Sequence, residues 1–365
     1  MPYKMSLTSI RESSNRIRIK EIDTAKGIGM LLVVFAHVNY TPFLLNYIYS
    51  FHMPLFFVLS GFLFDKEKYS SFTDFLKRRL KNLVCPYILF AVISVLFECV
   101  IEIYGNGFSL EVATIFCEGI TGVFLSRGSS DFFNAPLWFV LCLLAVEIIY
   151  FFVSKLKSGF IFIACIPLVV LGWFLESEYF MFNNKLLPWS IDSALFALGF
   201  YALGNLMSGR AKKYIFLLSK HKNKNLICAG IIVLCLAAGI PLAMANGKVS
   251  LGSKILNNGF IFYATGIIGT VLVVCAGIML RKSRFLAWCG QNSFYIMAVH
   301  YLCRVSLRYV YKLFDIQIYD KTSLKETILP YFVILFISIL FAYCYEKLKK
   351  LCVCHICRRK SCHQN

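Results

Sequence analysis

Charged residues are scarce in this chain. They make up 16% of its 365 residues, whereas soluble domains carry roughly 25%. Acidic residues are the scarcest, with 19 Asp and Glu against 38 Lys and Arg and a formal net charge of +19. Hydrophobic residues reach 59%, and the mean hydropathy is +0.69. A soluble core does not need so many long apolar runs, so the composition excludes a soluble domain and indicates a polytopic membrane protein.

Linkers, repeats and targeting segments are also missing. No low-complexity linker or internal repeat divides the chain, so we expect one membrane domain over residues 22–345, between cytoplasmic segments 1–21 and 346–365. The first segment is basic and polar without an apolar core, which argues against a cleavable signal peptide. We therefore expect the first helix to direct membrane insertion. The tail does not end in a prenylation motif.

Hydropathy and the polar interruptions predict an all-α fold of about ten membrane-spanning helices. The expected spans cover residues 22–40, 47–64, 83–103, 137–153, 160–175, 189–207, 226–244, 258–280, 293–311 and 328–345. With the N-terminus in the cytoplasm, most of the 38 Lys and Arg fall on inner segments, as the positive-inside rule requires. Both termini are therefore expected in the cytoplasm. The longest outer segment, 104–136, is expected to be a surface connection or a contact for an extracellular acceptor.

The basic residues recur on every inner segment, so we expect them to orient helices and meet anionic membrane lipid, with no role in nucleic-acid binding.

Most of the 15 cysteines fall within spans, where a thiol packs as a small apolar group. The tail holds Cys352, Cys354, Cys357 and Cys362, whose spacing fits no standard zinc module. An unmodified tail is favoured, with lipid acylation and a metal site as alternatives, and we expect no metal in the functional site.

Ionisable residues in the first two spans indicate a functional site, because burying them in a membrane is costly. Lys26 and His37 are eleven residues apart, which places them on one helix face roughly 16 Å apart along the axis. Asp23 lies near the same stripe. His52 enters the second span at about the depth of His37, and Pro54 beside it frees a backbone carbonyl that needs a wet or protein-lined cavity. The two imidazoles predict a general base with its positioning partner; simple bonding to a neighbouring helix is the alternative.

These residues resemble the acyltransferase-three family of integral-membrane acyltransferases, especially its fucose 4-O-acetylase-like branch. The family's opening pattern, an acidic and a basic residue before G-I-x-x-x-L-V-V-x-x-H, matches Asp23, Lys26, Gly27 and His37. Further matching motifs are SFHMPLFFVLSGF at 50–62, KRRLKNLVCPY at 77–87, PLWF at 136–139 and NSFYIMAVH at 292–300. The resemblance covers nearly the whole chain.

The resemblance implies an enzyme of the cell membrane that uses cytoplasmic acetyl-CoA, or another acyl-CoA, as co-substrate. It implies transfer of the acetyl or similar acyl group to a hydroxyl of a cell-surface sugar or polysaccharide. It also implies that His37 is catalytic and that Lys26 belongs to the donor site. Some members carry arginine at the Lys26 position, and lysine keeps the charge without the bidentate fork that arginine offers phosphate.

The basic cluster entering the third span agrees with a donor that arrives from the cytoplasm. Lys77, Arg78, Arg79 and Lys81 lie next to the Lys26 end of the first span, so we expect them to bind donor phosphates, with topology alone as the alternative. His37 is expected either to deprotonate the acceptor hydroxyl or to accept the acyl group itself. Asp23 is expected to pair with Lys26 or orient the donor, and His52 to tune His37 or hold the acceptor.

On the acceptor side we expect Trp138, Asp192 and His300, with simple placement at the membrane interface as the alternative for Asp192. A basic stripe on the ninth span holds His300, Arg304 and Arg308, and the candidate partners for an ion pair with it are Glu98, Glu102 and Glu147.

No feature indicates an oligomeric state. A secondary transporter or flippase is the alternative class, although repeat symmetry is lacking and the histidines of the first two spans lie near one membrane face.

Overall fold

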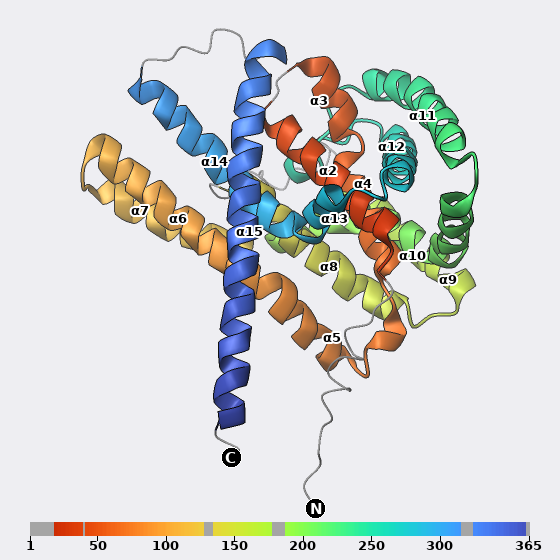
Figure 1. The fold of residues 1–365 in the computed structure, drawn as a ribbon, viewed down its shortest axis with the longest axis horizontal. Helices are drawn as coiled ribbons and strands as arrows, with labels where there is room; N and C mark the ends of the chain where they lie inside the picture. The colour runs from red at the N-terminus through yellow and green to blue at the C-terminus, as the bar shows by residue number, and fades with distance from the viewer. Residues whose placement is uncertain (1–17, 39–40, 128–133, 177–186, 315–323, 363–365) are drawn as a thin grey trace, which may run out of the picture.

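The chain folds into an all-α bundle (Figure 1). The computed structural model describes residues 18–38, 41–127, 134–176, 187–314 and 324–362. The α-helices are α2 (Lys20–Val38), α3 (Pro42–Tyr49), α4 (His52–Leu63), α5 (Phe72–Arg79), α6 (Cys85–Asn106), α7 (Leu110–Leu125), α8 (Trp138–Val153), α9 (Ser158–Glu176), α10 (Ile191–Lys220), α11 (Lys224–Asn246), α12 (Gly259–Met279), α13 (Arg284–Gln291), α14 (Ser293–Leu313) and α15 (Leu324–Cys362). The side chains of the four tail cysteines lie outside the described part of the chain.

Short turns of other helical types connect these elements. They are η1 (Lys66–Lys68), the π-turn η2 (Leu80–Val84), η3 (Ala135–Leu137), η5 (Pro188–Ser190) and η6 (Leu251–Ser253). Among the described residues, β pairing is limited to a single antiparallel bridge between Ser250 and Ile255. The prediction of an all-α membrane bundle is therefore confirmed.

Helices lie at all ten positions where spans are expected. Eight helical stretches among the described residues are long and apolar enough to cross a membrane: Pro42–Leu63, Phe72–Asn106, Ala135–Val153, Ser158–Leu175, Pro188–Lys220, Lys224–Asn246, Gly259–Met279 and Thr327–Leu351. The other two expected spans correspond to α2 and α14, and both helices carry several ionisable residues. The count of ten crossings and the cytoplasmic position of both termini stay predictions.

Helix α7 lies in the segment 104–136, for which the sequence predicts a surface connection or a contact for an extracellular acceptor, and that role stays a prediction. It follows α6 after a turn at Gly107, whose φ of +79° favours glycine, and the two helices lie side by side (Figure 1). The Tyr87 hydroxyl of α6 donates to the Val123 carbonyl of α7 at 2.7 Å. At Gly119 a side chain would meet Val95 of α6 at 2.8 Å. These contacts hold α6 and α7 together as a hairpin, in which α7 has only 16 residues, fewer than the roughly 20 that a membrane span needs.

Helix α2 is held at the centre of the bundle, with α12 on one side and α14 and α15 on the other (Figure 1). Its N-terminal half packs backbone to backbone against α13. A Cβ atom at Gly27 would lie 2.0 Å from the Leu286 carbonyl oxygen, and one at Gly290 would lie 1.8 Å from the Asp23 carbonyl oxygen. No larger residue fits this crossing without moving a helix. The glycine next to Lys26 therefore fixes where the lysine and the rest of α2 stand.

Candidate active site

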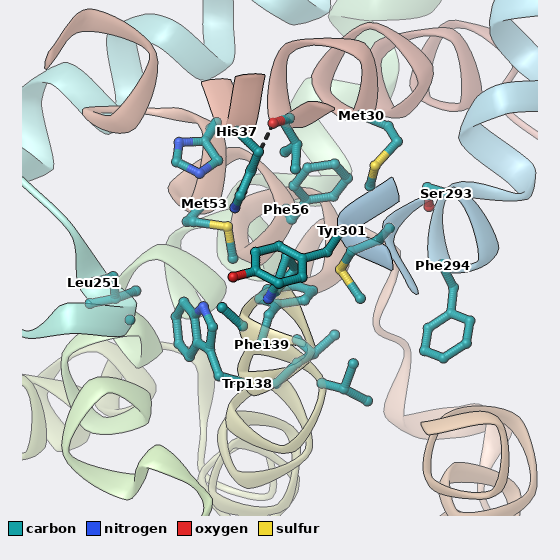
Figure 2. Close-up of a pocket in the computed structure, with 18 of the residues that line it drawn as sticks. Met30, His37, Met53, Phe56, Trp138, Phe139, Leu251, Ser293, Phe294 and Tyr301 are labelled. Atoms are coloured by element: carbon teal, nitrogen blue, oxygen red, sulfur yellow. Dashed lines mark hydrogen bonds between the residues drawn. The ribbon is translucent and has the colours of Figure 1, made fainter. Parts of the chain in front are cut away.

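A single cavity of about 370 Å³ is lined by four of the residues that the sequence selects, Lys26, His37, His52 and Trp138. Its wall comes from α2, α3, α4, α8, α14 and the turn that contains η6, and includes Lys26, His37, Tyr49, His52, Trp138, Tyr301 and Arg304. Figure 2 shows His37 and Tyr301 pointing into the cavity, with Trp138 and Phe139 on the facing wall. The predicted arrangement, with Lys26 and His37 on one face of α2, is therefore what the structure contains.

The protonation pattern of His37 follows from its hydrogen bond. Its Nδ1 lies 2.8 Å from the Val33 carbonyl oxygen one turn earlier in α2. A carbonyl oxygen only accepts, so Nδ1 must carry the hydrogen, and in the neutral ring Nε2 keeps the free lone pair. Because His37 is half-buried and lines the cavity, this lone pair is available to a bound hydroxyl or thioester. The side chain is thus prepared to act as a base or a nucleophile.

His52 is fixed in the same way and lines the same cavity as His37. Its Nδ1 donates to the Ile48 carbonyl at 3.0 Å, which again leaves Nε2 as an acceptor. The ring of Tyr49 is a neighbour of both histidines, with its centroid 6.4 Å from that of His37 and 4.7 Å from that of His52. His37 is close enough to act on His52 electrostatically, and the role of His52 as a positioning partner of His37 stays a prediction.

His300 of α14 is the imidazole that contacts His37. Their ring centroids are 5.0 Å apart and the ring planes meet at 75°. His300 is completely buried, and its Nδ1 donates to the Met297 carbonyl at 2.7 Å. It does not line the cavity as described, so the expected direct contact with the acceptor is not what the structure shows.

A group of charged side chains surrounds Lys26 at one end of the cavity. Asp23, Glu147 and Arg79 are close enough to act on Lys26 electrostatically. Arg79 Nε lies 2.9 Å from Glu147 Oε2, and the two side chains are 25% and 5% exposed. Asp23 accepts a hydrogen bond from Gln291 Nε2 at 2.9 Å. Glu147 therefore pairs with Arg79 instead of the basic stripe on α14, which corrects one of the pairings considered from the sequence.

Only one residue of the predicted basic cluster turns inward. Arg78 is exposed and pairs with Asp74 at 2.9 Å, while Lys77 and Lys81 are exposed. Arg79 differs because it lies one turn after the buried Phe75 on α5, and its guanidinium packs over the Phe75 ring. The π-turn η2 follows and joins α5 to α6. Leu83 of that turn lines the cavity. Arg79 is thus partly buried and paired with Glu147, whereas the other three basic residues of the cluster are exposed.

Asp192 also has a different environment from the expected one. It is buried, pairs with Lys254, and accepts hydrogen bonds from the backbone N–H groups of Leu187 and Ser193. Ser193 in turn donates to the Leu251 carbonyl at 3.0 Å. Asp192 therefore anchors the turn 250–253, whose residues line the cavity, and it does not line the cavity itself.

Trp138 supports the same turn from the other side. A Cβ atom at Gly252 would lie 2.5 Å from the Trp138 indole, so the ring packs directly on the glycine backbone. Tyr49, Tyr301 and the serines of the turn are lining residues that the sequence does not single out. Tyr301 directly follows His300 in the chain, and that adjacency is the one signal that points to it.

Among the described residues, no group of three or more histidine, cysteine or acidic side chains is arranged to hold a metal ion. A family model described as an acyltransferase domain matches residues 19–347 of the chain, which include every residue of the cavity. A search of curated proteins gives no match.

Proposed function

Because the chain belongs to this acyltransferase family and is a membrane acyltransferase, we propose that it transfers an acetyl group from cytoplasmic acetyl-CoA to a hydroxyl of a cell-surface sugar. The enzyme would reside in the cell membrane. One observation supports this proposal most strongly: Lys26 and His37 line the same cavity three turns apart on α2. A cation and a base at opposite ends of one cavity suit a long donor with charged phosphates at one end and a thioester at the other.

The donor enters at the Lys26 end in this proposal. Lys26 and Arg79 offer positive charge to CoA phosphates, and Glu147 holds the Arg79 guanidinium in place until the donor arrives. The distance along α2 from Lys26 to His37 is about 16 Å, which an extended pantetheine arm can span. Apolar groups such as Met30 and Phe56 line the intervening wall and keep water from the thioester.

The acceptor sugar enters from the end formed by Trp138, Tyr301 and the turn 250–253. Aromatic rings suit the apolar faces of sugars, and the serine hydroxyls and backbone of the turn suit their hydroxyl groups. His37 Nε2 takes the proton of the reacting hydroxyl while its oxygen attacks the thioester carbon. The C–S bond then breaks, and the CoA thiolate receives the proton from His37.

The same lone pair is also placed for a route in which Nε2 attacks the thioester first. An acyl-imidazole then forms, CoA leaves, and the sugar hydroxyl attacks the acyl carbon in a second step. A burst of CoA release before sugar acylation identifies this route. Release of CoA and acylation of the sugar at equal rates from the first turnover identifies direct transfer.

The test uses purified protein, acetyl-CoA and a panel of methyl glycosides, with CoA and acetylated sugar measured by chromatography. His37→Ala is expected to lower kcat by on the order of 100-fold to 10,000-fold, because the base is lost. The matched control is His221→Ala, an exposed histidine outside the cavity, which should keep full turnover. A His37→Ala protein as active as wild type, or a wild type that moves a sugar across vesicles without releasing CoA, would overturn the proposal and favour a transporter.

A further inference from the structure

Arg304 places a positive charge in the half of the cavity that contains His37. Its side chain is half-buried and lines the cavity together with Tyr301 of the same helix. The guanidinium carbon of Arg304 lies over the Tyr301 ring, 5.4 Å from the ring centroid, and Figure 2 shows that this ring points into the cavity. A guanidinium that stacks on an aromatic face keeps its N–H donors at its edge, where they can bind an anion.

The position of Arg304 along the cavity follows from the way α14 packs on α2. Gln291, just before α14, donates to Asp23 at 2.9 Å, and further along both helices the ring of His300 lies 5.0 Å from that of His37. Arg304 is four residues after His300, so its backbone lies roughly 6 Å further along α14, away from the proposed donor end. Helical side chains lean toward the N-terminus, and the guanidinium is close enough to act electrostatically on His37.

Lys26 and Arg304 thus stand at opposite ends of the cavity, and their surroundings differ. Two carboxylates act on the charge of Lys26. Among the described residues that line the cavity, none is an aspartate or a glutamate. Asp192, which anchors the turn 250–253, does not line the cavity and is paired with Lys254. A wall with cations and no lining carboxylate attracts a negatively charged ligand, whereas the hydroxyl hydrogens of a neutral sugar are well matched by carboxylate acceptors.

We propose that the acceptor is an acidic sugar, whose carboxylate or phosphate binds Arg304 while a hydroxyl of the same sugar reaches His37. The inference rests on the proposed function above and adds the chemical class of its acceptor. The rise along α14 from His300 to Arg304 is comparable with the width of one sugar ring, so a single ring can extend from the base to the guanidinium. Arginine binds carboxylate and phosphate through two parallel N–H···O bonds. Such a bond fixes the orientation of the ring and selects the hydroxyl that meets His37 Nε2.

The test compares matched neutral and acidic acceptors with purified wild type and acetyl-CoA. The pairs are methyl glucoside with methyl glucuronide and methyl galactoside with methyl galacturonide, and the corresponding sugar phosphates form a third arm. Release of CoA and formation of acetylated sugar are measured by chromatography. In at least one set, kcat/KM should be higher for the acidic sugar by on the order of 10-fold to 100-fold. A preference for the uronic acids indicates a carboxylate, and a preference for the sugar phosphates indicates a phosphate.

Two substitutions assign this preference to the guanidinium of Arg304. Arg304→Gln removes the charge and should lower kcat/KM for the acidic sugar by on the order of 10-fold to 100-fold, while kcat/KM for its neutral partner and KM for acetyl-CoA stay nearly constant. Arg304→Lys keeps the charge without the fork and should retain part of the preference. The matched control is Arg308→Gln, one turn further on α14, where the side chain is exposed and does not line the cavity. It should leave the preference unchanged.

The outcomes distinguish this inference from the proposed function. A wild type that acetylates neutral and acidic sugars equally well would overturn the acidic acceptor and leave the proposed function standing. An Arg304→Gln protein that keeps the full preference, loses activity equally with both sugars, or changes only KM for acetyl-CoA would overturn the role of Arg304. A wild type that shows no transfer to any sugar and no release of CoA would overturn the proposed function, and this inference with it. Activity with the neutral sugar and thermal unfolding in detergent report the folding of each variant, and Arg304→Lys gives the comparison if Arg304→Gln unfolds.

Discussion

The two ends of the cavity are built in different ways. At the donor end, Lys26 stands on a helix locked by the Gly27 and Gly290 crossing, beside the buried pair of Arg79 and Glu147. At the acceptor end, a turn forms much of the wall and is held from outside by Asp192. Helix crossings tolerate almost no change, whereas a turn can change its sequence while its anchor stays. The two ends of the cavity should therefore respond differently to substitution.

Removing the positive charge of Lys26 should cause the largest difference between the KM values of the two substrates. Lys26→Met is expected to raise KM for acetyl-CoA by on the order of 10-fold to 100-fold, because a charge-assisted bond to phosphate contributes about 1.5–3 kcal/mol. KM for the methyl glycoside should change little. The comparison variant is Lys157→Met, an exposed lysine between α8 and α9. Equal effects of Lys26→Met on both KM values would show that the two ends are not separate.

Loosening the anchor of the turn 250–253 should have a smaller effect. This effect should be on KM for the sugar and not on KM for acetyl-CoA. Asp192→Asn removes the charge that pairs with Lys254, so the turn 250–253 should lose its fixed position. We expect KM for the methyl glycoside to rise by about threefold to tenfold, since orientation is lost while no contact with the sugar is removed. KM for acetyl-CoA should stay constant. Asp65→Asn, which breaks an exposed pair with Lys68, should affect neither constant.

Much of the fold could be predicted from hydropathy, because long apolar runs in a membrane must form helices. The shared face of Lys26 and His37 could be predicted from the 3.6-residue period alone. Helix α7 was not predicted, because its 16 residues are fewer than the roughly 20 of a membrane span and its packing against α6 is a tertiary effect. The sequence specifies on which face of its own helix a residue lies. It does not specify which residue of another helix packs against that residue.

The site shows the same limit. The common depth of His37 and His52 could be predicted, and both line the cavity. The sequence did not show that Tyr49 contacts both of them or that α14 brings His300 to His37. Asp192 has a carboxylate at the expected depth, but its partner Lys254 is far away in the sequence, and only the folded chain shows that the charge is already satisfied. Arg79 differs from its basic neighbours because it shares the face of α5 that contains the buried Phe75.

The central claim is that one cavity joins the donor site at Lys26 to the base at His37. The most direct measurement is an electron cryo-microscopy structure of the His37→Ala variant with acetyl-CoA, in which turnover is prevented. We predict that the CoA phosphates lie against Lys26 and Arg79 and that the thioester lies beside residue 37, within the cavity. Acetyl-CoA bound elsewhere on the protein, with its thioester outside this cavity, would contradict the account.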